Sequence, residues 1–232
     1  MKIIAHRGAS SLLPENTLLS LEHALDMGVD MVEVDVRQSR DGEIVVFHDP
    51  TLDRTTNGTG RVKDKTLLEL KKLDAGQGER IPLLSEVLRR AKSKLDESNK
   101  VHPILIVEIK EPGIERMVLD IIKQEKMVKN VIVASFYHHV SLNLKSMDGK
   151  LKTGIIFIGQ PIHPEKMAID ARAEYMLPFH SYLGKKMVLN AHKHNIRVYT
   201  GVVDTGRDMK SVSRMGVDGV VTNKLLAMSK NY

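Results

Sequence analysis

Apolar and polar positions along this chain alternate in short stretches, and longer segments with helical spacing separate them. In residues 31–36 valines alternate with Glu33 and Asp35, a period of two that is typical of a β-strand. Residues 17–27 instead carry leucines at spacings of three and four, which predicts an amphipathic helix. With a short apolar strand at 3–5, the chain opens as strand, helix, strand. This order favours a parallel pair joined by a right-handed crossover.

The same alternation continues to the C-terminus. Strands are predicted at 3–5, 31–36, 104–109, 131–135, 154–158, 174–178, 197–203 and 218–221. Helices are predicted at 17–27, 84–95, 113–126, 138–147, 164–171, 184–194 and 206–215, and a short one after the last strand. About eight such units favour an α/β fold, the (β/α)8 TIM barrel. A doubly wound open sheet is the alternative, but no glycine-rich dinucleotide fingerprint follows the first strand.

One segment interrupts the alternation. Residues 44–48 are predicted to pair as a hairpin strand at the barrel rim, and 49–82 follow with many Asp, Thr, Asn and Gly residues. Thr66 and Glu69 have the spacing of a capping box for a short helix. We therefore expect a single TIM-barrel domain over 1–232, with 49–82 as a short insertion between barrel strands two and three, over the catalytic end.

Composition narrows the class of protein. The 232 residues include no cysteine, so a metal would have to be held by oxygen or imidazole. No apolar run reaches the roughly 18 to 20 residues of a membrane span, and no signal peptide is evident, which predicts a cytoplasmic protein. The net charge of +6 is scattered and aromatic residues make up 4%, which disfavours nucleic acid as a partner. We expect a small-molecule substrate and no stable membrane insertion, while the oligomeric state stays open.

Polar side chains gather at the C-terminal ends of the predicted strands, where barrels of this type carry their active sites. His6 and Arg7 directly follow the first strand. Glu33 and Asp35 lie late in the second strand, on one face, with Cα atoms expected roughly 6.5 to 7 Å apart. These four residues are therefore expected at one end of the barrel.

The third barrel strand adds Glu108 and Lys110 to the same end. Its alternate positions are apolar and should face the helices, so Glu108 and Lys110 are expected to point inward. Three carboxylates, with Glu33 and Asp35, would then lie near one spot, and their burial is costly without a cation. An all-oxygen ligand set selects Mg²⁺ or Ca²⁺ over Zn²⁺, and the choice between those two stays open.

This set of side chains suits the hydrolysis of a phosphate diester. A metal would neutralise charge on the phosphate oxygens and act as a Lewis acid. Arg7 offers phosphate a planar fork, and Lys110 offers a point charge. His6 and His48 have pKa values near neutrality, so one is expected to deprotonate the attacking oxygen and the other to protonate the leaving alkoxide.

Seven segments of the chain resemble the glycerophosphodiester phosphodiesterase family. They are HRGAS (6–10), PENT (14–17), EVDVRQSRDG (33–42), VVFHDPTLDRTTNGTG (45–60), IPLLSEVL (81–88), EIK (108–110) and GVDGVVTN (216–223). The resemblance covers nearly the whole chain, and the order and spacing of these motifs are highly specific.

The resemblance implies a TIM barrel, a divalent metal, usually Mg²⁺ or Ca²⁺, and hydrolysis of a glycerophosphodiester to sn-glycerol 3-phosphate and an alcohol. Carried across by position, it implies metal ligands Glu33, Asp35 and Glu108, an acid–base pair His6 and His48, and phosphate-binding residues Arg7 and Lys110. Glu15 and Asn16 of the PENT segment are expected to support the first loop, and Asn16 also to cap the first helix.

The chain departs from the family pattern at the end of the seventh strand. Many members carry a Trp there, whereas this chain has Gly201 and no Trp at all. The lost wall of the pocket puts the contact with the glycerol or the alcohol of the substrate in doubt. Phe136, Phe179 and Tyr182 are candidate replacements.

Several alternatives stay open at this stage. The attacking oxygen is either the glycerol hydroxyl of the substrate, through a cyclic phosphate, or water. A lysophospholipase D or a sphingomyelinase D-like enzyme would keep the chemistry but needs an apolar entry, and no exposed apolar stretch is evident near the strand ends. A non-catalytic barrel that binds phosphodiesters is the alternative from another class, against which the intact histidines and carboxylates count.

Overall fold

Parallel strands and surrounding helices alternate through the computed structural model, which describes residues 1–98 and 104–225. The strands are β1 (Lys2–His6), β2 (Met31–Gln38), β3 (Ile44–Val46), β4 (Leu105–Ile109), β5 (Val131–Ser135), β6 (Lys152–Phe157), β7 (Tyr175–Pro178), β8 (Arg197–Thr200) and β9 (Gly219–Thr222). The α-helices are α1 (Leu18–Asp26), α2 (Leu67–Leu70), α3 (Leu84–Ser98), α4 (Glu115–Gln124), α5 (His138–Met147), α6 (Pro164–Asp170), α7 (Lys185–Lys193) and α8 (Gly206–Met215). Two 3₁₀ turns are η1 (Val62–Asp64) and η2 (His180–Tyr182).

The sheet closes on itself. Within the described ranges, eight parallel strands run in the order β1, β2, β4, β5, β6, β7, β8 and β9, and β9 pairs back with β1. Because each of these eight strands has a parallel neighbour on both sides, the sheet has no open edge, which contradicts a doubly wound sheet. The prediction of a (β/α)8 TIM barrel is confirmed.

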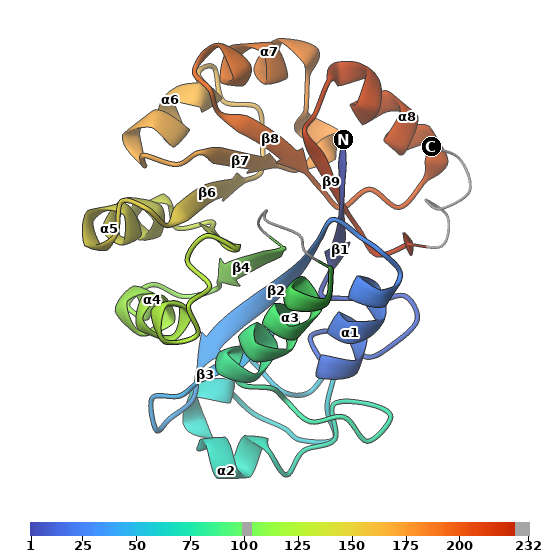
Figure 1. The fold of residues 1–232 in the computed structure, drawn as a ribbon, viewed down its shortest axis with the longest axis vertical. Coiled ribbons are helices and arrows are strands. Elements are labelled where there is room, and N and C mark those ends of the chain that lie inside the picture. The colour runs from blue at the N-terminus through green and yellow to red at the C-terminus, as the bar shows by residue number, and fades with distance from the viewer. Residues whose placement is uncertain (99–103, 226–232) are drawn as a thin grey trace.

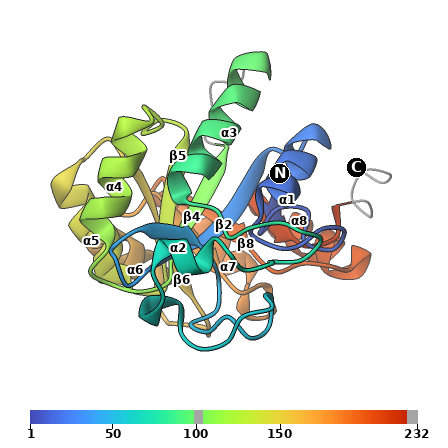
Figure 2. The ribbon, with the colours of Figure 1, turned by 90° about the horizontal axis from the view of Figure 1, so that it is seen from below.

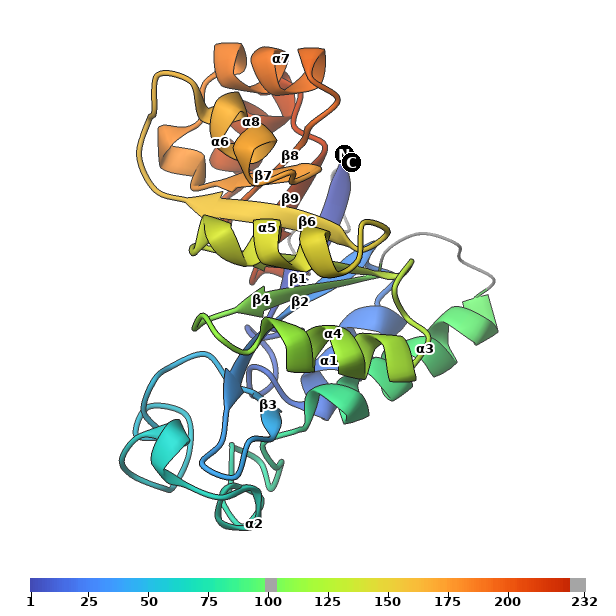
Figure 3. The same ribbon diagram turned by 90° about the vertical axis from the view of Figure 1, so that its left-hand side faces the viewer.

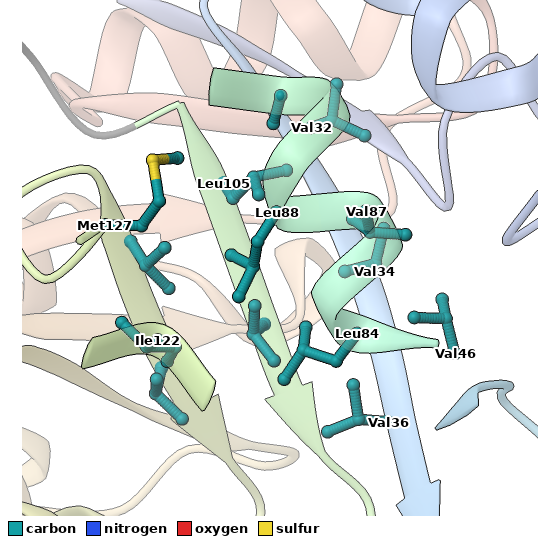
Figure 4. Packing of buried hydrophobic residues seen from close by; sticks show 14 of the residues in the cluster. Val32, Val34, Val36, Val46, Leu84, Val87, Leu88, Leu105, Ile122 and Met127 are labelled. Atoms are coloured by element: carbon teal, nitrogen blue, oxygen red, sulfur yellow. The ribbon is translucent and has the colours of Figure 1, made fainter. Parts of the chain in front are cut away.

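The helices lie outside the strands, as Figures 1 and 2 show. Helix α3 illustrates why: Leu84, Val87 and Leu88 recur at spacings of three and four, so they form one apolar stripe. That stripe packs on the outer faces of β2 and β4, where Val34 and Leu105 are buried (Figure 4). The alternating valines of β2 thus face the helices, which leaves the acidic positions between them to face the barrel interior.

The segment beyond β2 forms an addition at one end of the barrel. Strand β3 pairs antiparallel with β2, as predicted for a rim hairpin, and ends at Val46 rather than at His48. Helix α2 projects beyond β3 in Figure 3. Buried side chains that precede α2, lie in it or follow it pack together and stabilise the segment, among them Leu52, Leu70 and Ile81. The predicted capping box is present, because Thr66 accepts from the Glu69 N–H and Glu69 accepts from the Thr66 N–H.

Some predicted boundaries differ from the structure. The N-cap of α1 is Thr17, whose Oγ1 accepts from the Ser20 N–H, so the prediction of Asn16 as cap is wrong. Strand β8 ends at Thr200, three residues before its predicted end. A short helix predicted after the last strand lies outside the described residues. Within those residues, no helix is long and apolar enough to cross a membrane.

Candidate active site

Strand register explains why the predicted site residues meet. His6 lies opposite Glu33 in the β1–β2 ladder, and Asp35 lies opposite Glu108 in the β2–β4 ladder. Residues opposite one another in neighbouring strands point to the same face of the sheet. Closure of the barrel turns that face inward, so the four side chains converge at the C-terminal ends of three adjacent strands.

Glu33, Asp35 and Glu108 form a buried cluster of carboxylates. One oxygen from each lies within 4.8 Å of the others, and the three residues are at most 9% exposed. Glu33 Oε1 and Asp35 Oδ1 are buried without a hydrogen-bond partner. Burial and the neighbouring carboxylates raise the pKa of Glu33 well above its usual range and that of Glu108 to about 7. Unpartnered oxygens in a repulsive cluster fit a hard divalent cation such as Mg²⁺ or Ca²⁺.

Two cations flank this cluster. Arg7 Nε lies 3.3 Å from Asp35 Oδ2, and Lys110 Nζ lies 2.5 Å from Glu108 Oε1 and 3.5 Å from Asp35 Oδ1. Burial alone would lower the pKa of Lys110, but the carboxylates of Glu108 and Asp35 outweigh it and raise this pKa. Both cations therefore stay charged and offer donors to an anion beside the carboxylates.

The loop after β1 presents Arg7 in an unusual conformation. Arg7 has a φ of 56°, in the left-handed region that few residues other than glycine adopt. Gly8 follows with a φ of 80°, and a Cβ at Gly8 would lie 2.3 Å from Ser20 Oγ. Asn16 closes the loop from the other side, donating to Asp35 Oδ2 and accepting from the Asp35 N–H. The segment 6–17 thus holds both Arg7 and one carboxylate of the cluster.

A hydrogen-bond chain orients His6. Asn223 Nδ2 donates to Asp204 Oδ2 over 2.7 Å, so Asn223 Oδ1 faces Nδ1 of His6, also 2.7 Å away. An amide oxygen only accepts, so Nδ1 of His6 carries a proton. Nε2 of His6 is then free to accept a proton, and it lies 3.9 Å from Glu33 Oε2. Burial and the Arg7 charge lower the pKa of His6.

A carboxylate orients His48. Nδ1 of His48 lies 2.5 Å from Asp49 Oδ1, and hydrogen bonds from Arg54 keep the pKa of Asp49 below its usual range. An ionised carboxylate only accepts, so Nδ1 of His48 carries a proton here as well. Burial lowers the pKa of His48, although the Asp35 and Asp49 carboxylates oppose that shift.

Arg54 ties two loops of the site together. Its guanidinium donates to both oxygens of Glu15, over 2.9 and 2.7 Å, and to both oxygens of Asp49, over 2.6 and 3.0 Å. Glu15 also accepts from Arg7 Nη1 over 2.9 Å. Burial alone would raise the pKa of Glu15, but Arg54 and Arg7 outweigh it and lower this pKa to about 2. The bridge links the loop after β1 to the segment that begins with His48.

A pocket of about 280 Å³ opens at this end of the barrel. Its lining residues are His6, Arg7, Glu33, His48, Ile106, Glu108, Lys110, Phe136, Ile156, Leu177, Phe179, Gly201, Val202 and Val221. The ring centroids of Phe136 and Phe179 lie 6.3 Å apart, and Lys110 Nζ lies 5.8 Å from the Phe136 ring. One wall is therefore charged and the other apolar, and Lys110 joins the two.

Of the three aromatic side chains considered as a wall near Gly201, Phe136 and Phe179 line the pocket, whereas Tyr182 does not. A Cβ at Gly201 would lie 2.7 Å from the Cβ of Val221, so Val221 fills the space that a side chain would enter. The expectation that no apolar stretch is exposed near the strand ends is wrong. Ile158 and Ile162, in the loop between β6 and α6, are 58% and 88% exposed.

The structure brings together all seven predicted site residues, although Asp35 lies behind the pocket surface. Sequence reasoning missed the residues that orient the histidines: Asp49, Arg54, Asp204 and Asn223. Asn223 directly follows β9 and Asp49 directly follows His48. The rule that polar residues at strand ends belong to the site therefore could have found these two.

Comparison with known proteins agrees with this geometry. The model of the glycerophosphoryl diester phosphodiesterase family matches residues 6–227. A glycerophosphodiester phosphodiesterase of Caldanaerobacter subterraneus is 37% identical over 95% of this chain and 93% of its own length. One of Bacillus altitudinis is 34% identical over 96% of this chain and 94% of its own length.

Solved structures agree as well. A phosphodiesterase of Oleispira antarctica, in complex with the product sn-glycerol 3-phosphate, superposes with a TM-score of 0.89 at 26% identity, over 98% of this chain and 95% of that one. A glycerophosphodiester phosphodiesterase of Thermotoga maritima has a TM-score of 0.82 at 26% identity, over 99% and 97%. The family match extends over nearly all of the barrel and its site, and the chain therefore belongs to the glycerophosphoryl diester phosphodiesterase family of enzymes.

Proposed function

We propose that this enzyme hydrolyses glycerophosphodiesters to sn-glycerol 3-phosphate and an alcohol, with a divalent metal held by Glu33, Asp35 and Glu108. The observation that carries the proposal is the carboxylate cluster with unpartnered oxygens, which opens on a pocket with two cations and two oriented histidines. The names of the relatives and the product bound by the Oleispira antarctica enzyme support the substrate class.

The metal, Mg²⁺ or Ca²⁺, when bound, supplies Lewis-acid polarisation of the phosphate. Arg7 and Lys110 bind the remaining phosphate oxygens, Arg7 by two parallel N–H donors and Lys110 as a point charge. Arg7 and Lys110 pair with carboxylates of the cluster in this structure. A metal ion among these carboxylates would take over that pairing, so the donors of Arg7 and Lys110 would become available to phosphate. This arrangement positions the phosphorus next to both histidines.

We assign the general base to His6 and the general acid to His48. His6 is oriented by a neutral amide, which leaves Nε2 unprotonated, and takes a proton from the attacking oxygen. His48 faces the Asp49 carboxylate, which stabilises the imidazolium that donates its proton to the leaving alcohol oxygen as the P–O bond breaks. The attacking oxygen is either water or the glycerol hydroxyl of the substrate.

We also propose that 1–232 form one domain and that the segment 49–82 covers the catalytic end. The Arg54 bridge from Asp49 to Glu15 supports this, because it fixes the start of the segment against the loop that carries Arg7. The segment then limits the access of water to the charged wall of the pocket.

The test is release of glycerol 3-phosphate from glycerophosphocholine and glycerophosphoethanolamine, with Mg²⁺, with Ca²⁺ and with EDTA. We expect metal-dependent release that falls by at least about 10²-fold in His6→Ala and Glu33→Ala. His194→Ala is the matched control, since His194 is exposed at the C-terminal end of α7. A cyclic glycerophosphate trapped in a single turnover would identify the glycerol hydroxyl as the attacking group.

Two results would contradict the proposal. Undiminished release in EDTA, or in Glu33→Ala, would remove the metal from the chemistry. No release from either substrate with any metal, by folded protein, would favour a different phosphodiester or a non-catalytic barrel. Gly201, which replaces the Trp of many relatives, would then be the first position to examine.

The second candidate substrate is a monoacyl glycerophosphodiester, as in a lysophospholipase D. It is favoured by the apolar wall of Phe136 and Phe179 and by the exposed Ile158, which directly follows β6, two positions after the pocket-lining Ile156. A kcat/KM for lysophosphatidylcholine above that for glycerophosphocholine, reduced by Ile158→Asp for the lipid alone, would establish this candidate. Equal kcat/KM values for lysophosphatidylcholine in wild type and in Ile158→Asp would exclude this candidate. Nothing in the pocket favours a sphingomyelinase D-like reaction over this one.

A further inference from the structure

A basic groove of about 710 Å³ lies between the start of α7 and the outer face of α8. Its lining residues are Lys185, Arg207, Lys210, Ser211, Arg214 and Met215. Four of these six are cationic, and none is acidic. The groove is separate from the catalytic pocket, with which it shares no lining residue.

Arg207, Lys210 and Arg214 form a stripe along α8, three and four residues apart, on the side opposite the buried Met209 and Val212. Like charges at this spacing destabilise a helix, and a cation near a helix N-terminus also opposes the macrodipole. Across residues 1–98 and 104–225, no carboxylate forms an ion pair with any cation of the groove. Arg214, in the last turn of α8, suits the macrodipole, whereas Arg207 and Lys210 gain no such stabilisation.

The one acidic side chain of α8 does not compensate the stripe. Asp208 Oδ2 accepts from Thr205 Oγ1, the N-cap of the helix, and is engaged there. Lys185 and Lys186 open α7, and both are exposed. The outer surface at the start of α7 and α8 is thus strongly positive.

An exposed apolar loop lies next to this surface. Ile158 and Ile162 project from the loop between β6 and α6, and Ile162 is the most exposed large apolar side chain described. The side-chain nitrogen of Gln160, in the same loop, lies 3.8 Å from the point that a Cβ on Gly184 would occupy. Gly184 is the N-cap of α7 and directly precedes Lys185, so the loop lies close to the start of the helix that borders the groove.

The apolar loop and the part of the groove lined by Lys185 and Arg207 share one end of the barrel. Helices of a (β/α)8 barrel begin where the preceding strands end, so the loop after β6 and the first turns of α7 and α8 lie at the catalytic end. Figure 1 shows α6, α7 and α8 as successive neighbours around the barrel. Apolar side chains flanked by unpaired cations, without acidic counterparts, are typical of surfaces that bind the interface of an anionic membrane.

We propose that the loop 158–163 and the basic groove of α7 and α8 together dock the enzyme on an anionic phospholipid bilayer. Ile158 and Ile162 enter the headgroup region, while Lys185, Arg207 and Lys210 bind lipid phosphates. The net charge of +6 strengthens the approach to such a surface. Docking at this end brings the mouth of the catalytic pocket beside the lipid headgroups. The proposal does not depend on which phosphodiester the enzyme hydrolyses.

The experiment is co-sedimentation of the full chain with large vesicles of phosphatidylcholine, with and without roughly 30% of the anionic lipid phosphatidylglycerol. We expect binding to the anionic vesicles alone, weakening as salt rises. The double variant Arg207→Glu/Lys210→Glu is expected to weaken binding at least about 25-fold, since each basic residue near the surface contributes about fivefold. Ile162→Asp is expected to weaken it about tenfold.

Matched controls separate this surface from overall charge and from folding. Lys129→Glu/Lys150→Glu makes the same change in net charge, but both lysines precede strands, at the opposite end of the barrel. Ile169→Asp replaces a half-exposed isoleucine in the last turn of α6. Both controls are expected to bind like wild type, and thermal unfolding reports whether each variant is folded.

Three outcomes would overturn the proposal. They are no binding of folded wild type to anionic vesicles, equal binding to both vesicle types, and equal loss in the two charge-reversal pairs. A duplex DNA that competes fully with the vesicles, with an unchanged response to Ile162→Asp, would identify the groove as a nucleic-acid site instead.

Discussion

At the scale of single residues, the two histidines differ in what holds them. His48 is held by a carboxylate and His6 by an amide, although each donates its Nδ1 proton. The residues that make this difference, Asp49 and Asn223, lie at least partly buried behind the histidines. We therefore expect their contribution to the proposed reaction to be the positioning and tuning of a neighbouring ring, which can be measured separately from substrate binding.

The variant Asp49→Asn tests the assignment of His48 as general acid. Loss of the carboxylate removes an interaction that raises the pKa of His48, so the acid loses its proton at lower pH. We expect the alkaline limb of the kcat/KM profile to move to lower pH and kcat to fall about 10- to 100-fold. The pH profile of the release assay is the measurement, and Asp53→Asn, the same change on an exposed residue of the segment, is the control. A shift of the acid limb instead would assign the general base to His48 and the general acid to His6.

The variant Asn223→Leu tests the orientation of His6. Without the amide oxygen, Nδ1 of His6 loses its acceptor and the ring is free to adopt either tautomer. We expect kcat to fall about 10- to 100-fold with a smaller change in KM, because Arg7 and Lys110, the cations proposed to bind phosphate, are untouched. Asn143→Leu removes an amide that donates a partly buried hydrogen bond to Glu115, on helices outside the barrel, and should keep kcat. A change confined to KM would show that Asn223 acts on substrate binding.

At the scale of elements, β2 illustrates how one strand supports both the core and the site. Its valines pack beneath α3 (Figure 4), and its carboxylates, on the other face, join the buried cluster of the site. The period of two that separates these faces is visible in the sequence, and so is the apolar stripe of α3. The site therefore depends on helix packing that never touches the substrate.

Leu88→Ala measures that packing. Leu88 is fully buried on α3, so its truncation leaves a cavity against β2 and β4 and should lower the free energy of unfolding by about 2 to 4 kcal/mol. Chemical denaturation of the variant checks this value. Leu68→Ala on α2 is the matched control, because Leu68 is 69% exposed, and should change stability by less than about 0.5 kcal/mol. Equal losses in both variants would contradict the packing of α3.

At the scale of the whole molecule, barrel closure buries three carboxylates next to one another. The pKa of Glu108 is raised from its ordinary value of 4.5 to about 7, so folding favours its protonated form. A group with a raised folded-state pKa stabilises the protein fully below its unfolded-state pKa, and this contribution is lost as the pH rises through the folded-state pKa. Metal-free protein should therefore lose stability between about pH 4.5 and 7.

The expected decrease in the free energy of unfolding due to Glu108 is on the order of 3 kcal/mol, and Glu33 changes it in the same direction. Mg²⁺ or Ca²⁺ is proposed to bind the ionised carboxylates, so it should raise the melting temperature at pH 8 more than at pH 5. Thermal unfolding with EDTA and with each metal checks both statements. Glu108→Gln should flatten the metal-free pH dependence, and an unchanged slope in that variant would assign the loss of stability to other groups.

The sequence by itself determined the fold class, the bounds of most elements to within two residues, and the seven residues that meet at the strand ends. The alternation of apolar and polar positions, with a period of two in strands and of three to four in helices, is a local property of the sequence. The chemically active residues of strand-end motifs such as HRG and EIK are likewise neighbours in the sequence. The capping box at Thr66 was predictable for the same reason, since both of its hydrogen bonds join residues three apart.

Only the tertiary structure decided which partners orient those residues and which surfaces stay exposed. His6 and Asn223 are 217 residues apart and meet because β9 closes the barrel against β1. Asn is a residue type favoured at helix N-caps, yet Asn16 forms its side-chain hydrogen bond with Asp35, because the left-handed loop turns it toward β2. The exposure of Ile162 and the convergence of the α7 and α8 cations also depend on contacts between elements, for which local sequence carries no signal.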